Sequence, residues 1–223
     1  MATLTVYPDP DIETTSVDGE TSESGSQTWA TIIAAAGDAK TDDEGTGYFV
    51  RIRAAVTLND FTYLGRPIIL FDTSALTAGA TISAAVLSIY GLSKEDGPGW
   101  SPTYNIYSSA PASNTALAAG DFDSLGSTAF CDSALTYASW TAEAYNDFTF
   151  NATGIAAVSK TGITKLGARS ANYDVAAVAP TWGAGEEATI AAYYADTALT
   201  TKDPKLVITY TLAATFVPQI TMI

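Results

Sequence analysis

The sequence predicts an all-β fold, an antiparallel, jelly-roll-like β-sandwich with one short helix. Runs of β-branched and aromatic residues recur along the chain, separated at short intervals by Gly, Pro, Asn, Asp and Ser. A clear helix start signal occurs near Asn151. Turn signals at this spacing, with so little helix, are typical of a two-sheet sandwich.

The N-terminal part is predicted to alternate between short strands and polar loops. Residues 3–7 alternate in polarity and are expected to start the sheet. Residues 9–26 are polar and contain Pro and Gly, so a long loop is expected there. Residues 29–34 are predicted to form a short strand, and 37–47 an acidic turn region.

The strongest strand predictions lie in the middle of the chain. Residues 48–58 and 61–71 are rich in β-forming residues, and Asn59-Asp60 between them predicts a hairpin turn. Further strands are predicted at residues 82–92, 104–107, 165–169, 188–194 and 206–212.

The remaining segments are predicted to be loops, with one helix. Residues 93–101, SKEDGPGWS, are expected to be a loop. Residues 110–128 are small and polar, and one helical turn is expected near residues 115–119. Asn151 is expected to cap the N-terminus of a short helix at residues 152–160.

Residues 1–212 are predicted to form one domain, because no change in composition marks a linker. The last segment, residues 213–223 (AATFVPQITMI), is unusually apolar. We expect an arm that packs on a neighbouring subunit, and an extra edge strand on its own domain is the alternative. The arm residues expected to make the contact are Phe216, Val217, Ile220, Met222 and Ile223.

Three motifs carry a resemblance to a known family. They are FDTS at residues 71–74, GATI followed by AVLSIY at residues 79–90, and DPKLVITYT at residues 203–211. With these motifs the chain resembles DNRLRE-type domains, a jelly-roll group related to carbohydrate-binding modules, over residues 48–211. The resemblance implies a binding or structural module that is not an enzyme. Asn151 stands where the family has Asp, and Gly65-Arg66-Pro67 also departs from the pattern.

Composition and charge exclude several classes of function. The chain has 24 acidic and 10 basic residues, a net charge of −14, which disfavours binding to nucleic acid. It has no histidine, the commonest general base and metal ligand. Its one cysteine, Cys131, cannot form an intramolecular disulfide and is expected to be a free structural thiol.

The sequence also bears on location. The N-terminus, MATLTVYPDPD, lacks the basic and long apolar regions of a secretory signal. No segment has the roughly 18 apolar residues of a membrane span. A protein made in the host cytoplasm and carried on a virion would fit both observations.

Hydrolytic chemistry finds little support in the sequence. Glycosidases need two carboxylates that face one cleft. Glu186 and Glu187 would point to opposite faces of a strand. Asp121 and Asp123, like the 42–44 carboxylates, are expected to be solvated charges. A triad of the Ser-His-Asp type requires the missing histidine, so no catalytic residue is predicted.

A structural calcium ion is the one cofactor that the sequence leaves open, and jelly-roll modules similar to this chain often hold one. Calcium prefers carboxylate and carbonyl oxygens. Candidate oxygens occur in two segments, and neither has the spacing of an EF-hand loop. The candidate residues are Asp9, Asp11 and Glu13 in the first segment, and Asp38, Asp42, Asp43 and Glu44 in the second.

Two tryptophans are the candidate contact residues for a glycan or a protein partner. Trp100 and Trp182 lie in Gly- and Pro-rich loops, where exposed side chains are expected. Tyr63, Tyr104 and Tyr173 could add to such a surface. The alternative is that each tryptophan closes an end of the sandwich.

Together these observations predict a non-enzymatic phage virion structural protein, either a capsid decoration protein or a fibre or tail accessory subunit. It would act through protein–protein contacts, as a homo-oligomer and with other virion proteins, and adhesion to a surface glycan is left open as a further role. The alternative is a carbohydrate-binding module or a cell-surface adhesion domain. Neither nucleic acid nor membrane is an expected partner.

Overall fold

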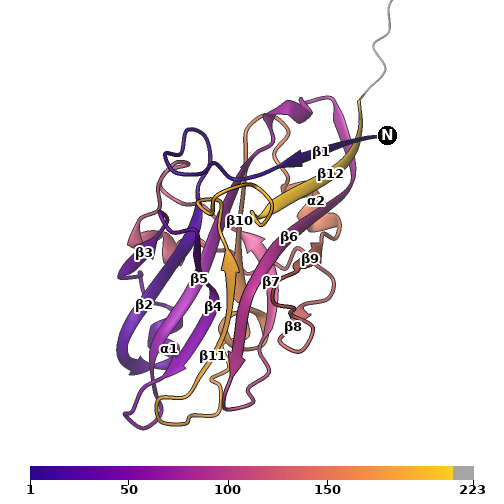
Figure 1. The fold of residues 1–223 in the computed structure, drawn as a ribbon. Coiled ribbons are helices and arrows are strands. Elements are labelled where there is room, and N and C mark those ends of the chain that lie inside the picture. The colour runs from indigo at the N-terminus through magenta and orange to yellow at the C-terminus, as the bar shows by residue number, and fades with distance from the viewer. Residues whose placement is uncertain (213–223) are drawn as a thin grey trace, which may run out of the picture.

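The computed structural model of the chain describes residues 1–212, which form a curled, antiparallel, twelve-stranded sheet with few helical turns (Figure 1). This confirms the predicted all-β, sandwich-like fold. The strands are β1 Ala2–Val6, β2 Asp18–Thr28, β3 Ala39–Thr41, β4 Thr46–Ala54, β5 Asp60–Asp72, β6 Ala80–Asp96, β7 Thr103–Ser108, β8 Leu135–Thr136, β9 Tyr145–Thr149, β10 Ile163–Ser170, β11 Glu187–Tyr193 and β12 Lys205–Leu212.

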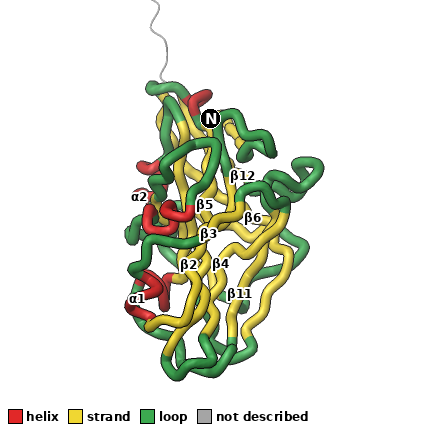
Figure 2. The backbone as a smooth tube through the Cα atoms, turned by 90° about the vertical axis from the view of Figure 1, so that its left-hand side faces the viewer, coloured by secondary structure: helices red, strands yellow, loops and turns green. Residues whose placement is uncertain are grey.

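The helical elements are short and lie between the strands (Figure 2). They are α1 Trp29–Ile33, α2 Ala152–Ala157, the 3₁₀ turns Ser74–Leu76 and Ala119–Ser124, and a π-helical turn at Ala171–Val175. No helix within residues 1–212 is long and apolar enough to cross a membrane.

The strand order is β1-β12-β6-β11-β4-β5-β10-β7-β8. In addition, β2 pairs with β5, β3 pairs with β2, and β9 pairs with β6. The long strand β6 connects the two parts of the sheet. Its first half pairs with β12 and β9, and its second half pairs with β11. The sheet therefore curls around the main core along this strand.

The position of β5 in the fold explains why residues 68–71, which end at the first residue of the FDTS motif, are all apolar. Ile69 and Phe71 point into the main core, which contains the buried side chains of β6, β9 and β12. Ile68 and Leu70 point to the other face, where Leu117 covers them. A strand buried on both faces needs apolar residues at successive positions, not only at alternate ones.

Several local predictions are confirmed. The chain turns between β4 and β5 at Asn59, which has a φ of 62°. Asn151 caps α2 as expected, since its side chain accepts a hydrogen bond from the Gly154 N–H at 3.0 Å. Cys131 is buried and free, and burial raises the pKa of its thiol to about 11.

The predicted 9–26 loop is wrong in its second half, which forms β2 and pairs with β5 along its length. This strand is polar but largely buried in its first half, and its polar groups have partners. Thr21, for example, donates its hydroxyl hydrogen to the Arg66 carbonyl at 3.0 Å. Composition alone missed β2 because hydrogen bonding inside the fold offsets its polarity.

The predicted strand at residues 29–34 is also wrong, because this segment forms helix α1. Thr28 caps it by accepting a hydrogen bond from the Thr31 N–H at 3.3 Å. Trp29 and Ile32, three residues apart, lie on one face of the helix and are both buried.

Two smaller differences concern element bounds. Strand β6 continues to Asp96, so its final residues belong to a segment that was predicted to be a loop. The helical turn expected near residues 115–119 lies further along the chain, at Ala119–Ser124.

Candidate functional site

Three loops come together in the structure. The first follows β1, the second precedes β4, and the third connects β11 to β12. Direct hydrogen bonds join them: the Asp11 N–H donates to Asp196 Oδ1 at 2.5 Å, and the Tyr194 N–H donates to the Gly45 carbonyl at 2.9 Å. The Thr197 hydroxyl also donates to the Gly45 carbonyl.

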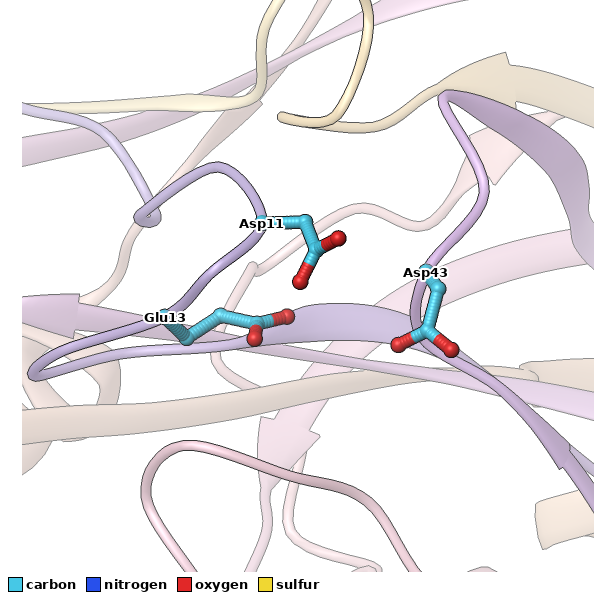
Figure 3. Close-up of side chains that lie close together, drawn as sticks. All are labelled: Asp11, Glu13 and Asp43. Atoms are coloured by element: carbon cyan, nitrogen blue, oxygen red, sulfur yellow. The ribbon is translucent and has the colours of Figure 1, made fainter.

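The three loops bring carboxylates into one small space. Asp11, Glu13 and Asp43 each place a carboxylate oxygen within 4.8 Å of the others (Figure 3). We call these three residues the acidic loop cluster. Oxygens that bind one calcium ion at about 2.3–2.6 Å can be up to about twice that distance apart. The spacing of the cluster therefore suits hard, oxygen-binding cations.

Negative charge accumulates around this cluster. Burial, together with the charges of Asp196 and Asp11, raises the pKa of Glu13. Burial, together with Asp11 and Asp43, likewise raises the pKa of Asp196. These carboxylates therefore repel one another when they are ionised.

Two more buried carboxylates interact electrostatically with Asp196. Burial, followed by the charge of Asp196, raises the pKa of Asp203 to about 6, and only 2% of the residue is exposed. Burial raises the pKa of Asp18 well above its usual value, although its carboxylate accepts hydrogen bonds from the Ala195 N–H.

Two buried carboxylate oxygens in this region have no hydrogen-bond partner within residues 1–212. They are Oδ2 of Asp196 and Oδ1 of Asp203. Buried polar atoms nearly always have a partner. None of the ion pairs within the described part of the chain includes Asp196, Asp203 or a member of the acidic loop cluster.

The sequence pointed to both acidic segments, but it did not show that they meet. Asp9 instead closes its own loop by accepting hydrogen bonds from Thr14 and Thr15. Asp42 pairs with Lys40 and accepts a hydrogen bond from the Leu117 N–H.

Two further residues of these segments lie outside the cluster, and three carboxylates near it were missed. Asp38 accepts a hydrogen bond from the Ser24 hydroxyl, and Glu44 is exposed. Asp196 and Asp203 were missed because they are distant in sequence and share no local spacing with the other two segments. Asp18 was missed although it lies only five residues after Glu13, because the strand β2 that begins there was predicted to be part of a loop.

The expected exposure of Trp100 is wrong. Its side chain is only 7% exposed, packs in a second core cluster with Phe61, and donates its ring N–H to the Thr181 carbonyl at 2.8 Å. The loop folds this ring inward because Asp96 accepts hydrogen bonds from the Trp100 and Ser101 N–H groups. Trp100 is therefore part of a buried core cluster, not an exposed contact residue.

Trp182 is half-buried and packs against the same cluster. Its ring N–H is enclosed and has no partner within residues 1–212. Of the three tyrosines considered with the tryptophans, Tyr104 is buried, whereas Tyr63 and Tyr173 are half-buried. A contact role for Trp182 stays a prediction.

One member of each carboxylate pair considered for hydrolysis makes structural contacts, and Asp121, expected to be a solvated charge, is buried. Glu187 accepts a hydrogen bond from Arg51 at 2.6 Å. Asp121 accepts hydrogen bonds from the Ala112 and Ala118 N–H groups, each at 2.8 Å. Asp123 and Glu186 are exposed.

A second polar surface lies on strands β4 and β5. The Arg51 guanidinium lies 4.3 Å from the centre of the Tyr48 ring and 4.8 Å from that of the Tyr63 ring. Tyr63 donates its hydroxyl hydrogen to the buried carboxylate of Glu20 at 2.9 Å. Burial raises the pKa of Glu20 to about 7, although Tyr63 and Arg51 act in the opposite direction.

The five arm residues, Phe216, Val217, Ile220, Met222 and Ile223, lie outside the residues that the structure describes. The last described residue, Leu212, is 59% exposed. Its strand, β12, pairs with β1 on one side and β6 on the other.

No protein-family model matches the sequence, and no curated protein matches it. Its function must therefore be argued from its own residues.

Proposed function

We propose that this chain is a non-enzymatic structural subunit of a phage virion, a capsid decoration protein or a fibre or tail accessory subunit. In this role it acts by contacting copies of itself and other virion proteins. The observation that carries the proposal is the open sheet edge at β1, together with the apolar sequence 213–223 that follows the exposed end of β12.

Strand β1 has one neighbour, β12, within residues 1–212, so its other edge is unpaired there. The pairing of Ala2 with Tyr210 places the start of β1 next to the end of β12, and the unpaired edge of β1 is its opposite side (Figure 1). Unpaired strand edges readily accept an additional strand from another chain. The described part of β12 ends at the exposed Leu212, and the apolar sequence 213–223 follows it.

Two further observations support a role without catalysis. The chain has no histidine, and the carboxylates Glu187 and Asp121 are held in structural contacts. The sequence motifs also resemble a family of binding and structural modules.

Removal of residues 215–223 tests this proposal. Burying a large apolar side chain contributes about 1.5–3 kcal/mol, and the truncation removes five of them from the contact. The shortened chain is expected to keep its β-sheet circular dichroism but to dissociate in multi-angle light scattering. A full-length variant with Phe216 and Ile220 changed to Ser should behave like the truncation. An unchanged mass for both chains would refute the assembly role of the arm.

A carbohydrate-binding module is the second candidate, favoured by the half-buried rings of Tyr48 and Tyr63 on a sheet face. Aromatic rings beside charged and polar groups are common in ligand sites. In a glycan-array experiment, binding that disappears in Tyr63→Ala but persists in Tyr7→Ala would favour this candidate, since Tyr7 is an exposed tyrosine elsewhere.

A further inference from the structure

We propose that an apolar groove between strand β6 and helix α2 receives the C-terminal arm, residues 213–223, of a second copy of this chain. The proposal rests on the proposed function, in which the arm binds a neighbouring subunit, and it names the surface that the arm contacts. Each copy has one arm and one groove, so two copies related by a twofold axis can exchange their arms reciprocally.

The groove is a hollow of about 350 Å³ whose walls are the first residues of β6 and one side of α2. The two elements contact each other (Figure 1). Ile82 and Ile155 line the groove, and both are only partly buried where they pack against the main core. The other lining residues are Thr81, Ala156 and Lys160. The groove therefore offers exposed apolar surface with one basic side chain and no acidic one.

The groove also borders a strand edge that is unpaired within residues 1–212. Residues 86–88 of β6 pair with β12 on one side and with β9 on the other. Residues 81–84 lie beside β12, but no described strand pairs with their other side. This is the side of β9, which leads directly into α2. A free strand edge next to apolar side chains is a surface to which an extended segment adds.

The arm has the composition that this groove requires. Its sequence, AATFVPQITMI, contains no charged side chain and includes the five large apolar residues already named. Pro218 has no backbone N–H and favours an extended conformation in the residue before it. Such a segment suits the edge of a sheet and is unsuited to its middle. The arm and the free edge of β6 are therefore complementary in both polarity and backbone chemistry.

The point at which the arm begins favours the groove of another copy. Leu212, the last described residue, is 59% exposed and lies opposite Ala80 at the start of β6. An arm that entered the groove of its own chain would have to pass around the start of β6 and reverse direction, because β12 and the free edge lie on opposite sides of β6. An arm that continues along β12 needs no reversal, and its eleven residues, when extended, span roughly 36 Å.

Sedimentation analysis of full-length variants tests the proposal. Ala156→Glu places a charged side chain in the groove without removing a packed group, since Ala156 is exposed. It is expected to raise the dissociation constant of the oligomer by about tenfold or more, with unchanged β-sheet circular dichroism. Ala157→Glu is the matched control, because Ala157 is an exposed residue of the same helix that does not line the groove. It should assemble like the original chain.

A second variant tests the other wall of the groove, so that the result does not depend on the folding of α2. Thr81 is exposed on β6 and lines the groove, and Thr81→Glu should weaken assembly as much as Ala156→Glu. Ala84→Glu changes an exposed residue of the same strand outside the groove and should assemble normally. Undiminished assembly of folded Ala156→Glu and Thr81→Glu would overturn the proposal.

The chain without residues 215–223 separates this proposal from the proposed function. If the shortened chain is monomeric but both groove variants still assemble, the arm binds another surface, so the docking site is refuted while the proposed function stands. If the shortened chain assembles like the full-length chain, both fail. A monomeric full-length chain that melts earlier in Ala156→Glu but not in Ala157→Glu would show that the arm covers its own groove, which also contradicts the proposal.

Discussion

Substitution of Glu20 tests how much a buried carboxylate destabilises this fold when it is ionised. Its residue is only 5% exposed, and burial raises the pKa of its carboxyl from 4.5 to about 7. Each pKa unit corresponds to about 1.4 kcal/mol. A shift of about 2.5 units therefore means that ionised Glu20 costs the folded state roughly 3 kcal/mol relative to the unfolded chain.

The sign of the pH dependence follows from the direction of the shift. Between about pH 4.5 and 7 the unfolded chain loses this proton while the folded chain keeps it, so rising pH favours unfolding. The contribution of Glu20 is neutral below this range and fully unfavourable above it. Glu20→Gln removes the charge and keeps an oxygen that can accept the hydrogen bond from Tyr63.

We expect Glu20→Gln to match the original chain in stability at pH 4 and to exceed it by about 2–3 kcal/mol at pH 8. Urea denaturation followed by tryptophan fluorescence at both pH values measures this difference. Glu95→Gln, an exposed change on β6, should alter stability little at either pH. The reasoning would be refuted if Glu20→Gln were less stable at pH 8, because an ionised Glu20 would then be stabilised by Arg51.

Two further predictions concern buried side chains. Trp100→Ala should lower the free energy of unfolding by about 3–5 kcal/mol in urea denaturation, as for other buried tryptophans. Trp182→Ala should lower it clearly less, because Trp182 is only half-buried. Equal decreases for the two variants would contradict this reasoning. Asp174 pairs with Arg66 and Arg169 at 2.7 and 2.6 Å. Burial favours a higher pKa for Asp174, but hydrogen bonds and charge from the two arginines outweigh it and lower the pKa. The contribution of Asp174 to the free energy of unfolding is therefore present at neutral pH and lost as the pH falls through the folded-state pKa. Asp174→Asn should therefore cost about 3–5 kcal/mol at pH 7 in the same assay, and an unchanged midpoint would show that the pair adds nothing.

The sequence predicted the strands well where side-chain chemistry is local. β5, β6 and β12 carry continuous β-forming runs, and Asn151 signals α2 by its own capping chemistry. The sequence failed where long-range contacts decide the outcome. Strand β2 is polar in composition and is held by its pairing with β5.

The same reason explains what was missed at the candidate site. Asp11, Glu13 and Asp43 were among the candidate oxygens of two acidic segments, from which the sequence could identify no ligand, and only the fold shows that their two loops meet. Asp196 and Asp203 lie more than 150 residues further along the chain, counting from Asp43, and carry no local motif. Trp100 was misplaced because its Gly- and Pro-rich loop folds back onto the core.

The mass of the intact chain in dilute solution tests the proposed function most directly. One chain has a mass of 23.2 kDa. Sedimentation equilibrium of the full-length protein is expected to give at least twice this mass. The mass is expected to fall to that of the monomer when residues 215–223 are removed. A monomer at all concentrations, for both the full-length and the shortened chain, would contradict self-assembly through the edge of β1 and the C-terminal arm.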